Sequence, residues 1–155
     1  MTRADAGFAA PVEVRGDDRV GRHVVAMRAI RAGEVVAPLH AARRVNVATR
    51  YTVQIGANEH IDGLEEFTCL NHSCAPNVII DTAALEIKAL RDIAEGTELT
   101  YFYPSTEWHM AEPFACHCGA PACLGLINGA ESLSAEVLAG YVVNDHILAL
   151  RRPAQ

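Results

Sequence analysis

The sequence contains no run of apolar residues near the roughly 18 that a membrane-spanning helix needs. Its first residues, MTRADAGFAAPVEVRG, lack the positive patch and apolar block that mark a secretory signal. We therefore expect a cytoplasmic protein with no membrane partner, although delivery into a host compartment is compatible with the same sequence. Lysine is nearly absent: Lys88 is the only one among the 13 Lys and Arg residues, a bias typical of a GC-rich genome that hints at a bacterial source.

Positive charge is scarce overall. The 13 Lys and Arg residues face 19 Asp and Glu, for a formal net charge of −6 and a pI of about 5.6. This balance disfavours the phosphate backbone as a partner, so we expect no direct binding to nucleic acid. It favours a basic peptide or protein, of which histone-like and ribosomal proteins are examples. The 155 residues, half of them apolar, suffice for one ordinary core but not for two.

The first two thirds of the chain consist of short β-rich runs bounded by glycine or turn residues, which predicts a mostly β protein. The expected strands are 22–27, 34–39, 51–55, 77–81, 85–90 and 98–103. Residues 104–125 show no period of 2 or 3.6, so a bound metal is the best explanation for their order. After Ser134, a suitable N-cap, apolar spacing predicts a closing helix, which Gly140 weakens by about 1 kcal/mol relative to alanine.

Five cysteines without a secretory signal favour metal binding over disulfide bonds. Three of them, Cys116, Cys118 and Cys123, have the spacing C-x-C-x4-C, and Gly119 and Pro121 supply the turn that lets the thiolates converge. A structural zinc ion requires four ligands, so one must come from elsewhere in the chain.

Cys74 is the favoured fourth ligand, because its Ser-Cys-Ala-Pro-Asn setting is typical of a rigid turn. Cys69 lies in the apolar stretch FTCLNH and is expected in the core. His117 is an alternative ligand, but it would have to fold back between two ligating cysteines. Free buried thiols are a further alternative, and three cysteines in eight residues weigh against it.

Three motifs, in their order along the chain, resemble those of the SET-domain protein lysine methyltransferases. NHSCAPN at 71–77 resembles the N-H-S-C-x-P-N signature, ELTYFY at 98–103 the E-L-x-x-D-Y signature, and CHCGAPACLG at 116–125 the cysteine-rich post-SET tail. The match extends back to GRHVVAMRAIRAGEVV at 21–36, which is similar to the opening G-x-G segment, and to YTVQIGANEHIDG at 51–63, which is similar to the middle strands.

The resemblance implies several small sheets, with the NHSC segment and the late tyrosine segment passing through one another as a pseudoknot. It implies a SET domain at 12–110 after an N-terminal segment at 1–11, then a zinc-binding post-SET segment at 111–128. A C-terminal helix and tail would occupy 129–155.

The resemblance also implies the site residues. The family binds S-adenosylmethionine, and the positions that would contact it here are Gly21, Arg22, His23, Asn71, His72 and Trp108. Tyr103 would be the active-site tyrosine. One zinc ion would be held by Cys74, Cys116, Cys118 and Cys123. Trp108 and Phe114 would line the adenine or lysine pocket, although plain packing explains isolated aromatics equally well.

The implied reaction needs a neutral amine, whereas the pKa of free lysine is about 10.4. A dry channel and the positive sulfonium both disfavour the ammonium, so no strong base is required. Tyr103 would orient the amine. Tyr101 occupies a position where, in the family, the identity of the aromatic residue tunes how many methyl groups the product lysine carries. The tyrosine hydroxyl leaves less room for a bulkier methylated lysine, so we expect mainly mono- or dimethylation.

The sequence departs from the family pattern in three places. His23 replaces the second glycine of G-x-G. A glycine there has no side chain and lets the backbone approach the cofactor, whereas the imidazole is bulky. Phe102 replaces an aspartate, and Thr68-Cys69-Leu70 replaces Arg-Phe-Ile. Because of His23 and Phe102, a catalytically silent SET-like module that binds peptide or cofactor stays an alternative function. The cysteines taken alone suggest a second alternative, a thiol redox or zinc-handling protein. Little room exists for a separate substrate-selecting domain, so selection would depend on this domain or on a homodimer partner.

Overall fold

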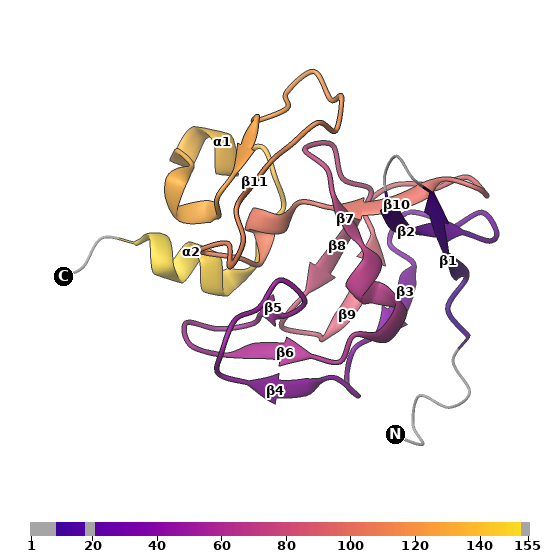
Figure 1. The fold of residues 1–155 in the computed structure, drawn as a ribbon, viewed down its shortest axis with the longest axis horizontal. Helices are drawn as coiled ribbons and strands as arrows, with labels where there is room; N and C mark the ends of the chain where they lie inside the picture. Colours follow the sequence, from indigo (N-terminus) through magenta and orange to yellow (C-terminus); the bar gives the residue numbers. More distant parts are fainter. Residues whose placement is uncertain (1–8, 18–20, 153–155) are drawn as a thin grey trace.

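The computed structural model describes residues 9–17 and 21–152, which form small β-sheets and a few short helices (Figure 1). The strands are β1 (Val12–Asp17), β2 (Gly21–Ala26), β3 (Val35–Pro38), β4 (Arg43–Val45), β5 (Val53–Gln54), β6 (His60–Asp62), β7 (Asn71–His72), β8 (Val78–Asp81), β9 (Glu86–Ala89), β10 (Glu98–Tyr101), β11 (Phe114–Ala115) and β12 (Leu126–Ile127). The helical elements are η2 (Glu65–Cys69), η3 (Tyr103–Ser105), η4 (Ala130–Ser132), α1 (Ala135–Ala139) and α2 (Asp145–Arg151).

The sheet that positions the site has the strand order β1-β2-β10-β7. Its antiparallel part buries β-branched and aliphatic residues, and the paired Val24 and Leu99 are fully buried. At its other edge β10 runs parallel to β7, which sets Thr100 opposite Asn71 and Tyr101 opposite His72. This pairing brings the NHSC motif beside ELTYFY, as the pseudoknot prediction requires.

Two three-stranded sheets complete the main core, with the orders β3-β9-β8 and β4-β6-β5. Figure 1 shows β4 and β6 along the lower edge of the molecule, below β8 and β9, with β5 just above β6. Alternate residues of β9 point inward, so Ile87 and Ala89 are buried while Glu86 and Lys88 are not. The core is therefore built from strand faces rather than from a long helix.

The C-terminal part forms a second, smaller cluster around Phe102, Ala130, Leu138 and Ile147. It contains α1 and α2 and lies beside the β11-β12 hairpin (Figure 1). Asn144 joins this part to the main core, because its buried amide donates to the carbonyl oxygens of Ile80 and Ser105, both at 2.9 Å.

All six strands expected from the sequence are present; the one expected at 22–27 keeps its length but begins and ends one residue earlier, and the other five are shortened by one to three residues in all. The strand expected to reach Tyr103 ends at Tyr101 because the turn of η3 follows. The single closing helix is instead two helices. It begins at the expected Ser134 N-cap, whose hydroxyl accepts the N–H of Val137, but it ends at Gly140. Within the described residues, no helix has the length and apolarity to cross a bilayer.

Candidate functional site

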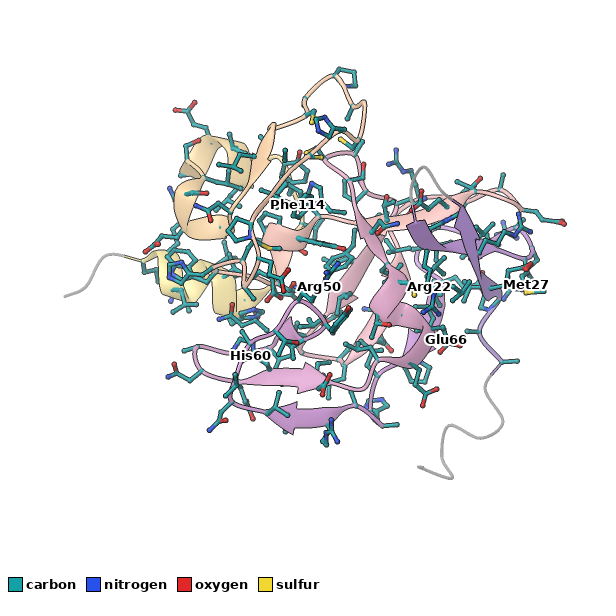
Figure 2. All side chains as sticks on the ribbon, viewed as in Figure 1. Arg22, Met27, Arg50, His60, Glu66 and Phe114 are labelled. Atoms are coloured by element: carbon teal, nitrogen blue, oxygen red, sulfur yellow. The ribbon has the colours of Figure 1, made fainter. Side chains whose placement is uncertain are left out.

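A cavity of about 640 Å³ opens where the main sheet meets the C-terminal part. Its walls come from four stretches of chain, 49–53, 64–73, 98–103 and 107–118. Figure 2 shows Arg50 and Phe114, which both line it, near the middle of the molecule. The volume lies within the range of small-molecule and cofactor sites.

Tyr103 and Tyr101 form one wall of the cavity, with their ring centroids 4.7 Å apart. The Tyr103 hydroxyl donates to the carbonyl oxygen of Leu70 at 2.7 Å. Burial raises the pKa of both phenols above the ordinary tyrosine value. Both side chains are therefore neutral around pH 7, able to orient a polar group but not to act as anionic bases.

The Asn-His pair of β7 contributes the adjacent wall. Asn71 donates from Nδ2 to the carbonyl oxygen of Arg22 at 3.2 Å and to Glu98 Oε2 at 3.0 Å. Its side chain therefore joins the start of β2 to the start of β10. At the end of the same motif, Asn77 exchanges two bonds with Thr100 and donates from Nδ2 to the Glu98 carbonyl oxygen at 2.9 Å. The sequence did not single out Asn77. Its side-chain amide bonds to the backbone of β10, as a further strand residue beyond the end of β7 would.

His72 connects the cavity to the cysteine cluster. Its Nδ1 accepts the backbone N–H of Tyr103 at 3.1 Å, so in the neutral ring the proton lies on Nε2. Nε2 is 3.3 Å from Cys74 Sγ and donates to it. Burial lowers the pKa of His72 to about 4, which keeps the ring neutral near pH 7. The imidazole thus links the turn that begins with Tyr103 to Cys74, a predicted metal ligand.

The ligand atoms of Cys74, Cys116, Cys118 and Cys123 all lie within 4.8 Å of one another. The Cys74 and Cys116 sulfurs are 4.0 Å apart. Four sulfurs in a tetrahedron around zinc, each about 2.3 Å from it, would be separated by about 3.8 Å. Burial raises the pKa of Cys116 to about 12 and also raises that of Cys74, so a cation beside them is needed to hold them as thiolates. The residues therefore fit one structural zinc ion.

The structure also resolves the choice of fourth ligand. Cys74 joins the three tail cysteines, whereas His117 is exposed and lies outside this group of described residues. Cys69 packs against the main core, as its apolar surroundings predicted.

The C-terminal part secures the cysteine-bearing loop through Tyr141. Its hydroxyl donates to the carbonyl oxygen of Cys74 at 2.7 Å. Its ring stacks on Phe102, with centroids 3.6 Å apart and an interplanar angle of 1°. Phe102, which replaces the aspartate of the family pattern, therefore packs the segment after β10 against the C-terminal helices.

The remaining predicted cofactor residues lie outside the described cavity lining. Gly21, Arg22 and His23 open β2, and Arg22 is joined to the cavity through its carbonyl bond with Asn71. The His23 ring nitrogen Nδ1 lies 3.1 Å from the Gly21 carbonyl oxygen. Trp108 packs against the second cluster instead. Phe114, which was predicted together with Trp108 to line a pocket, does line the cavity. Their contacts with a cofactor stay predictions.

Several charged cavity residues were not anticipated, and Glu107 and Arg50 are two of them. Glu107 is buried and lines the cavity, and Arg50 enters it from the loop before β5. Neither lies in a recognisable motif. A signal for Glu107 was its position four residues after Tyr103, but nothing in the sequence indicates its burial.

Comparisons with known proteins agree with this geometry. A family model described as SET domain matches residues 21–104. Methyltransferase flvH of Aspergillus flavus is 39% identical over 121 residues, which cover 77% of this chain and 68% of flvH. A Schizosaccharomyces pombe histone-lysine N-methyltransferase, H3 lysine-4 specific, is 46% identical over 65 residues, covering 38% of this chain and 7% of that protein.

Solved structures show the same likeness. KRYPTONITE in complex with mCHG DNA and SAH superposes with a TM-score of 0.58 and 26% identity, over 74% of this chain and 28% of that one. KRYPTONITE in complex with mCHH DNA, an H3(1–15) peptide and SAH superposes with a TM-score of 0.59 and 25% sequence identity, over 77% of this chain and 30% of that one. This chain thus spans less than a third of those structures and a small fraction of the S. pombe enzyme. The lysine methyltransferases among these relatives support the protein-lysine methyltransferase class, and the SET match over more than half of the sequence shows that the chain belongs to the SET-domain family of methyltransferases.

Proposed function

We propose that this protein transfers a methyl group from S-adenosylmethionine to the ε-amino group of a lysine in a basic protein segment. The observation that carries the proposal is convergence: Asn71 and His72, the phenols of Tyr101 and Tyr103, and two of the four clustered cysteines border one cavity. A redox or zinc-handling protein would need the cysteines but would leave the rest of this arrangement without a role.

The cofactor would supply an electrophilic methyl group on a positively charged sulfur. The SAH in the related KRYPTONITE structures supports this choice. Asn71 and His72 would hold it, with Gly21, Arg22 and His23 on the adjoining strand. Zinc on the four cysteines would order the tail over the cavity, and His72 would position Cys74 through its Nε2–H. Since Cys116 and Cys118 also line the cavity, loss of the ion would open one of its walls.

The residues of the cavity would act on the amine by orientation and by exclusion of water. Tyr103 is hydrogen-bonded to the Leu70 carbonyl oxygen, which turns its oxygen lone pairs toward an incoming N–H donor. The apolar side chains of Phe67 and Phe114 reduce the water around that donor, and a drier environment lowers the pKa of a lysine amine. Holding the two reactants in line would supply up to roughly 7–11 kcal/mol of the barrier reduction.

Tyr101 would restrict the product to mono- or dimethyl-lysine. Its ring is buried and stands 4.7 Å from that of Tyr103, so its hydroxyl occupies space that a bulkier methylated amine would need. Mass spectrometry of the product checks this proposal. Trimethyl-lysine as the main product of the wild-type protein would contradict it.

The substrate would be a basic segment, in keeping with the net charge of −6. The H3 peptide in one related structure and the H3 lysine-4 specificity of several relatives support a histone-like class of substrate. KRYPTONITE is also described with DNA, but the acidic balance of this chain favours peptide over direct contact with nucleic acid.

Methyl transfer from labelled S-adenosylmethionine to a mixture of histones and ribosomal proteins tests the proposal. We expect labelled lysine, and we expect Tyr103→Phe to abolish the labelling without a large change in melting temperature. A peptide array would then define the target sequence. Binding of cofactor and peptide without any transfer would instead identify a catalytically silent module.

A further inference from the structure

Glu107 is a buried carboxylic acid at the cavity, for which the mechanism above has no role. It follows η3, the turn that begins with Tyr103, and only 7% of its surface is exposed. It lines the same cavity as Tyr101 and Tyr103. Acidic side chains are rarely buried without a partner of opposite charge, so its position calls for a functional explanation.

One carboxylate oxygen of Glu107 is fully engaged and the other is not. Oε2 accepts the backbone N–H of Gln54 at 2.9 Å and the hydroxyl of Thr106 at 2.7 Å. Oε1 has no hydrogen-bond partner among residues 9–17 and 21–152. The carboxylate of this cavity-lining residue is therefore held through Oε2, and within the described structure Oε1 is left as an acceptor.

None of the residues that the structure describes offers Glu107 a fixed counter-ion. Apart from the zinc-site cysteines, the ionisable groups around the cavity are Arg50, His72, Glu98, Tyr101, Tyr103, Glu112 and His117. Arg50 forms a 3.9 Å ion pair with Glu112 instead. On the far side, α2 brings Nε2 of His146 within 2.8 Å of the Thr106 carbonyl oxygen, and burial lowers the pKa of that imidazole.

Burial also raises the pKa of Glu107 to about 7, although the hydrogen bonds from Gln54 and Thr106 lower it. A carboxyl group with such a pKa exchanges protons readily near neutral pH, which suits it to general acid–base chemistry. The neighbouring phenols of Tyr101 and Tyr103 stay neutral and do not compete for this role.

We propose that Glu107 receives the ε-ammonium group of the substrate lysine and removes one of its protons before methyl transfer. This inference rests on the proposed function and adds the destination of the proton. The ammonium N–H bond breaks as an O–H bond forms on Oε1, giving a neutral amine and a neutral carboxylic acid. The amine lone pair then attacks the methyl group as the methyl–sulfur bond breaks and its electron pair goes to sulfur, which leaves a neutral thioether and a methylated ammonium group. The acid later gives its proton to water.

The test compares Glu107→Gln with Glu66→Gln, a matched loss of negative charge on the exposed surface of η2 outside the cavity lining (Figure 2). Glutamine keeps a carbonyl oxygen for the bonds from Gln54 and Thr106, so the fold should be retained. At pH 7.5 we expect kcat to fall on the order of 100-fold for Glu107→Gln and to be unchanged for Glu66→Gln.

Two further measurements separate proton transfer from a structural role. The rate of the wild type should level off above about pH 7, whereas that of Glu107→Gln should keep rising with pH as the substrate amine itself loses its proton. A peptide with S-aminoethylcysteine in place of lysine, whose amine is less basic, should restore most of the lost rate. Glu107→Asp keeps the carboxylate and should keep the wild-type form of the profile.

The outcomes are distinguishable. A wild type that transfers no methyl group to any substrate removes the proposed function and this inference together. An active wild type accompanied by a Glu107→Gln variant within threefold of it refutes the role of Glu107 alone. Equal losses on both peptides with an unchanged pH profile would likewise overturn it, because they would indicate positioning rather than proton transfer.

Discussion

Phe102→Asp restores the residue of the family pattern and should nevertheless destabilise this protein severely. Phe102 is 2% exposed and packs with Leu138 and Ile147, face to face with Tyr141. Truncating a buried phenylalanine costs about 3–5 kcal/mol. Loss of the aromatic stack adds roughly 0.5–1.5 kcal/mol. An unpartnered buried carboxyl adds about 1–3 kcal/mol more.

We therefore expect the free energy of unfolding to fall by at least about 4 kcal/mol, which for a domain of this size lowers the melting temperature by about 8–16 °C. Urea denaturation and thermal melting measure the two quantities. Phe102→Leu, which keeps an apolar side chain, is the control and should cost about 1–2 kcal/mol. A Phe102→Asp protein that melts within about 4 °C of the wild type would refute the packing described here.

Three further predictions concern the tail, the metal and pH. Tyr141→Phe keeps the ring stack but removes the bond to the Cys74 carbonyl oxygen, so it should cost about 1 kcal/mol in urea denaturation and speed zinc release to a chelator; unchanged release would contradict the anchoring role. Cys123→Ser should lower bound zinc from one ion per chain to nearly none by elemental analysis and expose residues 111–128 to limited proteolysis, while zinc retained at full occupancy would exclude Cys123 as a ligand. The pKa of Glu107 is raised on folding, from 4.5 to about 7, so its favourable contribution is complete below pH 4.5 and is lost as pH rises through 7. The wild type should therefore lose about 3 kcal/mol more stability than Glu107→Gln between pH 4.5 and pH 8, and parallel stability curves would show that the carboxyl is not buried as described.

The sequence alone determined the local features of this protein. Strand positions, the Ser134 cap and the three tail cysteines each follow from residues close together in the chain, where spacing and periodicity carry the information. The resemblance of NHSCAPN and ELTYFY to family motifs pointed to Asn71 and Tyr103 as residues of one site, although their contacts with a cofactor stay predictions.

Only the tertiary structure decided which distant side chains meet. It brought Cys74, which the sequence had favoured over His117, together with the tail cysteines, and it placed Phe102 against Tyr141. It also buried Glu107 at the cavity, where Gln54, 53 residues away, supplies a hydrogen bond. The physical reason is that burial of a single polar or aromatic side chain depends on how separate segments of the chain pack together. That packing cannot be predicted from the type of the residue or from its immediate neighbours in the sequence.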